Sequence, residues 1–130
     1  MKKIEICGKE YPIECSAYSY VKFVNFFNKS MTEDIQILKD YLVRQTIISK
    51  QVAEKNLSDQ ERIAFVSEYM QKYVGEFISA LTRIAWMMIY TANKEIEEYE
   101  NWLKSIKKFN IDDDWIVEVA EIAVDCFCWW

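Results

Sequence analysis

The chain has 130 residues, of which 52% are apolar and 28% are charged, with only two glycines and one proline. This composition excludes a disordered chain, a collagen-like repeat and a loop-rich β-sandwich, and the length suits one domain over residues 1–130. The formal net charge of −5 disfavours nucleic acid as a partner, because phosphate contacts need a basic footprint. We therefore expect a single, mainly α domain.

Residues 1–15 are predicted to form a β-hairpin. Four apolar side chains alternate there with charged ones, as in strands with one buried face: Ile4, Ile6, Tyr11 and Ile13. A two-residue turn at 8–9, with glycine first, would pair Ile6 with Tyr11. Pro12 would then face Glu5, and because proline has no N–H to donate, the second strand should be an edge there.

Residues 16–130 are predicted to form a bundle of about four to six helices. The first helix is aromatic and ends near Asn28, and its rings should cover the apolar face of the hairpin: Tyr20, Phe23 and Phe27. Ser30 and Glu33 have the spacing of a capping box, which starts a second helix that runs to about Lys55.

A second capping box, from Ser58 to Glu61, starts the longest helical pattern, in which Gly75 marks a bend or a break. Its apolar residues recur at steps of three and four, as in a helix packed in a bundle: Ile63, Val66, Met70, Tyr73, Phe77, Leu81, Ile84 and Met88. After Thr91 a separate helix is expected from Ile96 to the basic residues Lys104, Lys107 and Lys108. The last helix is predicted over 112–130.

The last nineteen residues hold six acids and no bases, so the preceding part of the chain is nearly neutral at +1. The same segment is rich in aromatic residues, and two interpretations stay open. The rings fold back into the core, or the segment binds a partner, with its acids attracting a basic helical protein and its rings serving as anchors. The candidate partner-binding residues are Trp115, Phe127, Trp129, Trp130, Asp112, Asp113 and Asp114.

The sequence contains little that supports an enzymatic function. The chain has no histidine, the usual base and metal ligand, and two glycines cannot build a phosphate-binding loop. Four carboxylates could hold a metal ion, although a run of charges usually marks a solvated face: Glu95, Glu97, Glu98 and Glu100. Four thiolates could hold zinc, but their spacing favours small buried side chains instead: Cys7, Cys15, Cys126 and Cys128. We predict no catalytic site, no cofactor and no metal.

The longest uncharged central stretch, Ile84–Asn93, has about half the ~20 residues that a membrane-spanning helix needs. The first ten residues carry two lysines but no apolar core of a signal peptide. We therefore expect no membrane association and a cytoplasmic location, in which the cysteines stay reduced.

The hairpin segment Ile4-Glu-Ile-Cys-Gly-Lys-Glu-Tyr11 has the form I-x-I-x-G-K-x-Y and leads into an aromatic helix and an all-helical body. In this plan the chain resembles the tail assembly chaperones of tailed phages and prophages of Gram-positive bacteria. Three segments are similar to those of small clostridial prophage proteins from tail-gene neighbourhoods: SAYSYVKFVNFF, TRIAWMMIYTANKEIEEYENWL and IDDDWIVEVAEIAVDCFC.

The resemblance implies a non-enzymatic protein of the bacterial cytoplasm that coats the long helical tape-measure protein before the tail tube polymerises around it. It also implies a longer form made by ribosomal frameshifting. The tail tube protein and a second copy of the chain are further candidate partners. Two alternatives stay open: a small metal-dependent enzyme built on carboxylates in a helical bundle, and a structural head or tail component of the virion.

Overall fold

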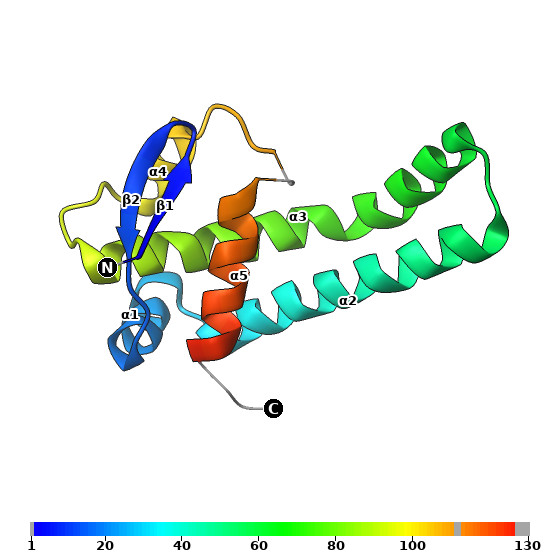
Figure 1. The fold of residues 1–130 in the computed structure, drawn as a ribbon. Coiled ribbons are helices and arrows are strands. Elements are labelled where there is room, and N and C mark those ends of the chain that lie inside the picture. Colours follow the sequence, from blue (N-terminus) through cyan, green and yellow to red (C-terminus); the bar gives the residue numbers. More distant parts are fainter. Residues whose placement is uncertain (1, 111–112, 127–130) are drawn as a thin grey trace.

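The computed structural model describes residues 2–110 and 113–126, apart from the side chains of residues 69, 70 and 72. A hairpin of β1 (Lys2–Ile6) and β2 (Lys9–Ile13) precedes five helices in this part of the chain. They are α1 (Ala17–Phe27), α2 (Met31–Lys55), α3 (Asp59–Ala92), α4 (Tyr99–Ser105) and α5 (Asp114–Cys126). The predicted mainly helical fold with an N-terminal hairpin is therefore confirmed (Figure 1).

The hairpin turn lies one residue earlier than predicted. Its central residues are Cys7 and Gly8, with φ angles of 53° and 79°, as a type I′ turn requires. Ile6 consequently pairs with Lys9, and the predicted pairing of Ile6 with Tyr11 is wrong. The pairing changes by two residues, and because side chains alternate with a period of two, every side chain keeps its face. The predicted buried face is confirmed: Ile4, Ile6, Tyr11 and Ile13.

The observed register also explains the proline in β2. Pro12 lies opposite Lys3 and not opposite Glu5. The pair next to a two-residue turn is hydrogen-bonded, and hydrogen-bonded and non-hydrogen-bonded pairs alternate from there along the strands. Pro12 belongs to the fourth pair from the turn and therefore occupies a non-hydrogen-bonded site. Its missing N–H would point away from β1, and the hairpin loses no ladder bond.

The hairpin packs on α3, and the predicted cover by the first helix is wrong. The Glu14 N–H donates to the Met88 carbonyl oxygen at 3.1 Å, and Trp102 of α4 meets the Tyr11 ring edge-on with centroids 6.5 Å apart. The rings of α1 instead contact aromatic residues of α3 and α4. Phe27, for example, lies 5.8 Å from Trp86 and 5.0 Å from Tyr99, measured between centroids.

The predicted start of the longest helix is confirmed. Ser58 Oγ accepts the Glu61 N–H at 3.3 Å, and the Ser58 N–H donates to Glu61 Oε1 at 3.4 Å. Ser30 caps α2 by accepting the Thr32 N–H at 3.2 Å. The Glu33 N–H, which a capping box would place on Ser30 Oγ, donates to the Ser30 carbonyl oxygen at 3.2 Å instead, so the predicted capping box is wrong here.

Two helix boundaries differ from the prediction. Helix α3 continues through Gly75 for 34 residues without a break. Helix α4 is only seven residues long and ends at Ser105, so Lys107 and Lys108 lie in the loop that follows. In the part of the chain that the structure describes, no helix is long and apolar enough to cross a membrane.

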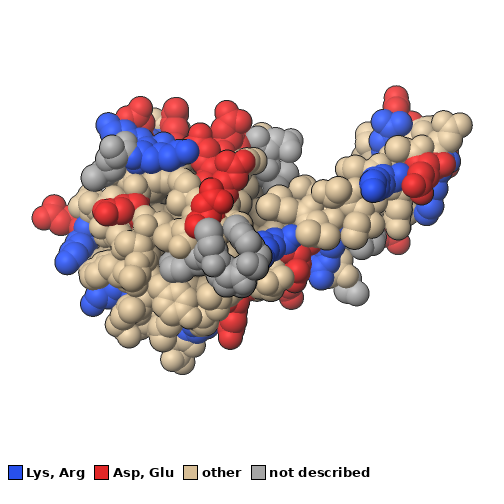
Figure 2. All heavy atoms as spheres, turned by 60° about the horizontal axis from the view of Figure 1, so that its bottom comes forward, with Lys and Arg blue, Asp and Glu red and all other residues tan. Residues whose placement is uncertain are grey.

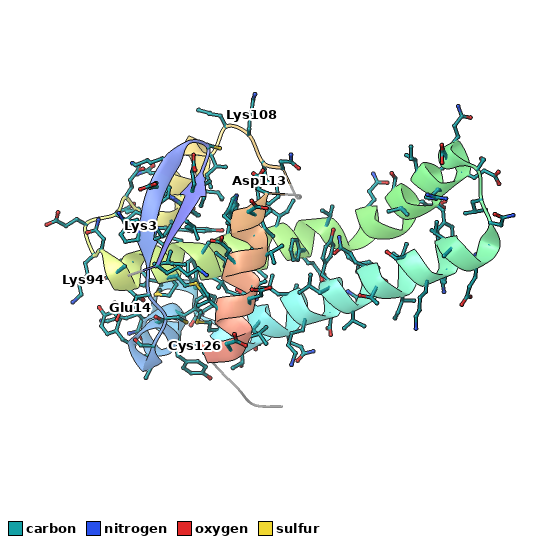
Figure 3. All side chains as sticks on the ribbon, in the orientation of Figure 1. Lys3, Glu14, Lys94, Lys108, Asp113 and Cys126 are labelled. Carbon is teal, nitrogen blue, oxygen red and sulfur yellow. The ribbon has the colours of Figure 1, made fainter. Side chains whose placement is uncertain are left out.

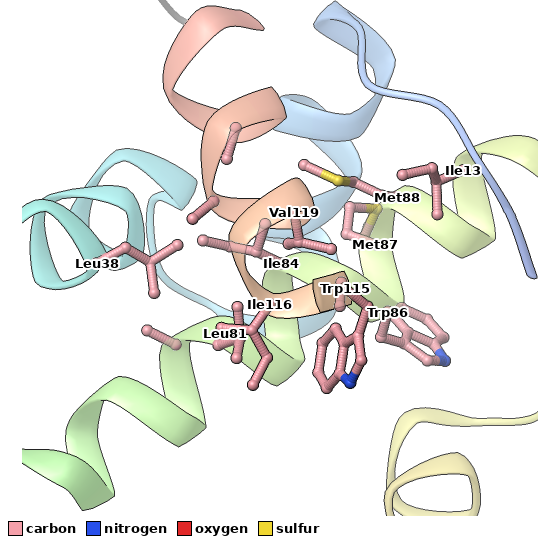
Figure 4. Packing of buried hydrophobic residues seen from close by; sticks show 14 of the residues in the cluster. Ile13, Leu38, Leu81, Ile84, Trp86, Met87, Met88, Trp115, Ile116 and Val119 are labelled. Atoms are coloured by element: carbon pink, nitrogen blue, oxygen red, sulfur yellow. The ribbon is translucent and has the colours of Figure 1, made fainter. Parts of the chain in front are cut away.

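The core lies where α5 crosses α2 and α3 beneath the hairpin (Figure 1). The C-terminal half of α3 supplies much of it, and its side chains meet those of α2, α5 and β2 (Figure 4). Among the residues that Figure 4 labels, the following are fully or almost fully buried: Ile13, Leu38, Leu81, Ile84, Trp86, Met87, Met88, Trp115, Ile116 and Val119.

A buried ion cluster joins α1, α2 and α3. The Asp34 carboxylate is completely buried in the first turn of α2. Arg83 of α3 donates to it through Nε at 2.7 Å and Nη2 at 2.8 Å, and Lys29 Nζ lies 2.8 Å from Oδ1. These hydrogen bonds raise the pKa of the Arg83 guanidinium. Two cations thus satisfy the one buried anion, as burial of a carboxylate requires.

We expect Ile6→Ala to lower the free energy of unfolding by about 2–5 kcal/mol, because Ile6 is 2% exposed and truncation leaves a cavity. Urea denaturation followed by circular dichroism measures the change. Ile63→Ala is the matched control, since Ile63 is 67% exposed and its truncation should cost at most about 0.5 kcal/mol. Equal effects of the two changes would contradict the placement of the hairpin in the core.

Asp34→Ala should destabilise the protein by about 3–5 kcal/mol, because it leaves two cations beside an apolar site without their anion. Asp40→Ala serves as the control on the same helix, where the carboxylate accepts a single bond from Gln36 at 2.9 Å. Asp40→Ala should change the free energy of unfolding, measured by urea denaturation, by at most about 0.5 kcal/mol. A small effect of Asp34→Ala would show that the cluster does not hold the helices together.

Candidate protein-binding site

Helices α2 and α3 extend beyond the rest of the fold as an antiparallel pair, which we call the arm (residues 42–75; Figure 1). We call the remainder the head. Contacts at successive levels hold the pair together: Tyr41 stacks on Phe77 with centroids 4.0 Å apart, the Arg44 guanidinium lies 3.9 Å from the Tyr73 centroid, and Lys55 Nζ lies 4.5 Å from that of Phe65. The arm is therefore an ordered two-helix hairpin.

Few side chains of the arm are buried, because two helices cannot enclose each other. Ile48 and Val52 are 2% and 6% exposed. Four large aliphatic residues, in contrast, are between 41% and 67% exposed: Leu42, Val43, Ile47 and Ile63. The predicted packing of Ile63 in a bundle is wrong, since none of the elements that the structure describes covers it. In Figure 2 the stretch of the arm next to the head is largely uncharged, and charged side chains gather at the tip.

A hollow of about 490 Å³ lies between the two helices of the arm, and we call it the arm groove. Its aliphatic residues are Leu42, Ile48 and Val66, and its polar residues are uncharged: Gln45, Thr46 and Ser49. Buried Ile48 forms the floor, while Leu42 and the polar side chains are exposed at the rim. Such a surface suits a partner with an apolar stripe and no fixed charge opposite the groove.

The arm groove continues onto α5. Leu42 also lines a second hollow, of about 360 Å³, whose other residues all come from this helix: Ala120, Glu121, Val124 and Asp125. An apolar path therefore leads from the arm to a helix that presents two acidic side chains. A helical partner with an apolar face and basic residues at one end would match both parts.

The structure brings together the predicted partner-binding residues that it describes. Asp113, Asp114 and Trp115 all line a hollow between α5 and the hairpin. Trp115 is only 4% exposed and meets the Phe109 ring edge-on at 6.0 Å, so most of its ring belongs to the core. The other predicted positions lie outside the described residues: Asp112, Phe127, Trp129 and Trp130.

Cys7 and Cys15 lie too far apart for the four cysteines to bind one zinc ion. Cys7 sits in the hairpin turn, where its Sγ donates to the Lys108 carbonyl oxygen at 3.1 Å. Cys15 follows β2 at the other end of the hairpin. The five residues of β2 separate it from the turn that holds Cys7, a distance of about 17 Å. Burial raises the pKa of the Cys15 thiol, and the nearby Cys126 thiol raises it further. Cys7 and Cys126 are exposed, so burial was wrongly expected for them.

The acidic run that was weighed as a metal site is solvated. Glu95, Glu97 and Glu98 lie in the loop before α4, Glu100 lies in its first turn, and all four are exposed. Across residues 2–110 and 113–126, no group of three or more acidic or cysteine side chains is arranged to hold a metal ion.

No protein-family model, no curated protein and no solved structure matches the chain. We therefore infer a function from the surfaces of the molecule. Sequence analysis missed the arm groove, although a signal for it was present. Helices of 25 and 34 residues are about 38 and 51 Å long, whereas the longest of the other described helices, α5, has 13 residues and is about 20 Å long.

Trp115→Ala should cost about 3–5 kcal/mol of unfolding free energy, as expected for a buried ring. Val117→Ala on the same helix is the control, because Val117 is 55% exposed and should change stability by less than about 0.5 kcal/mol. Thermal and urea unfolding of the two variants provide the comparison. A stable Trp115→Ala protein would return this ring to the list of candidate anchors.

Proposed function

We propose that this protein is a non-enzymatic assembly chaperone of a phage or prophage tail, which binds the tape-measure protein in the cytoplasm of the bacterial host. The resemblance of the Ile4–Tyr11 hairpin and of the helical segments to that family motivates the proposal. The arm groove is the observation that carries it, because an open apolar channel between two helices suits a third helix.

The client fits the groove in shape. The part of α2 that runs from Leu42 to Lys55 is about 20 Å long, which corresponds to roughly four turns of a helix lying beside it. An amphipathic client helix in the groove completes a three-helix bundle and covers Leu42, Ile48 and Val66. A long helical client offers many such segments, so several copies of the chaperone can bind along one molecule.

The charges suit reversible binding. The arm carries five basic and four acidic residues, whereas the rest of the chain carries 11 basic and 17 acidic ones. The acidic head attracts basic segments and speeds encounter, while the apolar groove sets how slowly the complex dissociates. Because only a few aliphatic side chains hold the client, tail-tube subunits that polymerise along it can displace the chaperone.

The test is co-expression with the tape-measure protein of the same phage, followed by affinity purification. The double variant Leu42→Gln with Ser49→Trp, which removes one aliphatic side chain and fills the groove, should reduce the co-purified and soluble client at least about tenfold. Val43→Gln with Ile47→Trp is the matched control on the same helix, since neither residue lines the groove. It should bind the client like the unaltered protein.

Three further results would contradict the proposal or the site that it assigns. Unaltered protein that neither binds the tape-measure protein nor keeps it soluble would exclude the client. Mass spectrometry that finds the chain in mature particles in stoichiometric amounts would identify a structural component of the virion. Equal loss of binding in the groove variant and in its control would place the contact elsewhere on the molecule.

A further inference from the structure

Strand β1 presents an open edge. In the observed register Ile6 and Ile4 are hydrogen-bonded to β2, so Lys3 and Glu5 direct their N–H and C=O groups away from it. Within the described part of the chain the sheet has two strands, and no backbone bond from another element reaches Lys3 or Glu5. Such an edge is a template for one more strand.

The opposite edge of the sheet is protected. Pro12 removes one donor from the outer side of β2. The loop of residues 93–97 lies beside this strand, where Asn93, Glu95 and Ile96 share a hollow with Pro12. The two edges of one hairpin therefore differ, because among the described residues the edge of β1 carries no proline and receives no backbone bond from another element.

A hollow of about 630 Å³ runs beside β1. Lys3, Ile4 and Glu5 line it on the strand side, and Asp114, Trp115 and Glu118 of α5 line it on the other. The bond from Cys7 Sγ to the Lys108 carbonyl oxygen attaches the loop before α5 to the hairpin turn and closes one end. Lys3, Lys108 and Asp113 mark this part of the molecule in Figure 3. A strand edge beside a helix is the arrangement that accepts an extended peptide.

We call this hollow the β1 groove, and its charge restricts which ligands it can bind. Among the described residues, five carboxylates line it, against two ammonium groups: Glu5, Glu10, Asp113, Asp114 and Glu118 against Lys3 and Lys108. Lys3 is already paired with Glu10 at 3.9 Å. The excess of negative charge favours basic side chains in the occupant and disfavours acidic ones.

We propose that the β1 groove binds an extended, basic segment of a partner protein, which adds to β1 as a third strand. Main-chain bonds to Lys3 and Glu5 hold the segment, and lysine or arginine at alternate positions meets the carboxylates. This site is separate from the arm groove, and the inference does not depend on the proposed function.

The probe is a fluorescent, capped seven-residue peptide of alternating lysine and threonine, titrated by fluorescence anisotropy. Methylating the backbone nitrogens of alternate residues removes donors from one edge of the peptide and leaves its charge unchanged. We expect this change to weaken binding at least about tenfold, and a glutamate–threonine peptide not to bind. Two methylated peptides are compared, one for each edge. If both bind as well as the unmethylated peptide, the contact is only attraction between charges and strand addition is overturned.

A matched pair of variants tests the protein side. Glu5→Pro and Glu10→Pro replace cross-strand neighbours, and each removes one carboxylate of the β1 groove and one N–H that points away from the other strand. Only Glu5→Pro removes a donor from the open edge, so it should weaken peptide binding about tenfold more than Glu10→Pro. Equal weakening would overturn the proposal. If Glu5→Pro fails to fold, titration of the unaltered protein with the methylated peptides tests strand addition in its place.

The arm-groove variant Leu42→Gln with Ser49→Trp separates this site from the proposed function. It should bind the lysine–threonine peptide with unchanged affinity although it loses the helical client. Loss of peptide binding in this variant would show that the peptide occupies the arm groove, and the β1 site would be rejected even if the chaperone function holds.

Discussion

The buried carboxylate of Asp34 is the interaction on which the rest of the structure depends. It lies in the first turn of α2 and is held from two directions, by Arg83 of α3 and by Lys29 of the turn after α1. A buried charge is tolerated only when its partners are in place, so the cluster permits one register between these helices and disfavours others. This register sets the stacking of Tyr41 on Phe77 at the base of the arm.

With that register fixed, α3 performs two tasks along its length. Its C-terminal half is the centre of the head, where the hairpin, α1, α4 and α5 pack around it. Among the elements that the structure describes, α2 alone lies beside its N-terminal half (Figure 1). The head is therefore stabilised by burial on many sides, and the arm by one seam reinforced by ring stacking and by cations over rings. An element that is ordered yet covered on one side only is well suited to receive a partner.

The two candidate surfaces would bind their partners through different interactions. The arm groove offers aliphatic side chains with uncharged polar neighbours, and its specificity comes from the shape of a helix. The β1 groove offers unpaired backbone groups beside carboxylates, and its specificity comes from extended conformation and positive charge. Helix α5 contributes side chains to both surfaces, with Ala120, Glu121, Val124 and Asp125 beside the arm and Asp114, Trp115 and Glu118 beside the hairpin.

The sequence by itself determined the local structure. Alternation of apolar and charged residues identified the buried face of the hairpin, and the Ser58–Glu61 box located the start of α3, because both signals depend on residues a few positions apart. The turn at Cys7 and Gly8 was missed, since a non-glycine residue with positive φ leaves little trace in the sequence.

Tertiary structure decided which apolar stripes are covered. Ile63 follows the same helical spacing as Phe77, yet it is exposed because none of the described elements of the head reaches it. Trp115 was open to two interpretations in the sequence and is buried because α5 crosses the core at that point. Periodicity shows which face of a helix is apolar, but only the packing of distant segments determines whether another part of the chain is there to cover it.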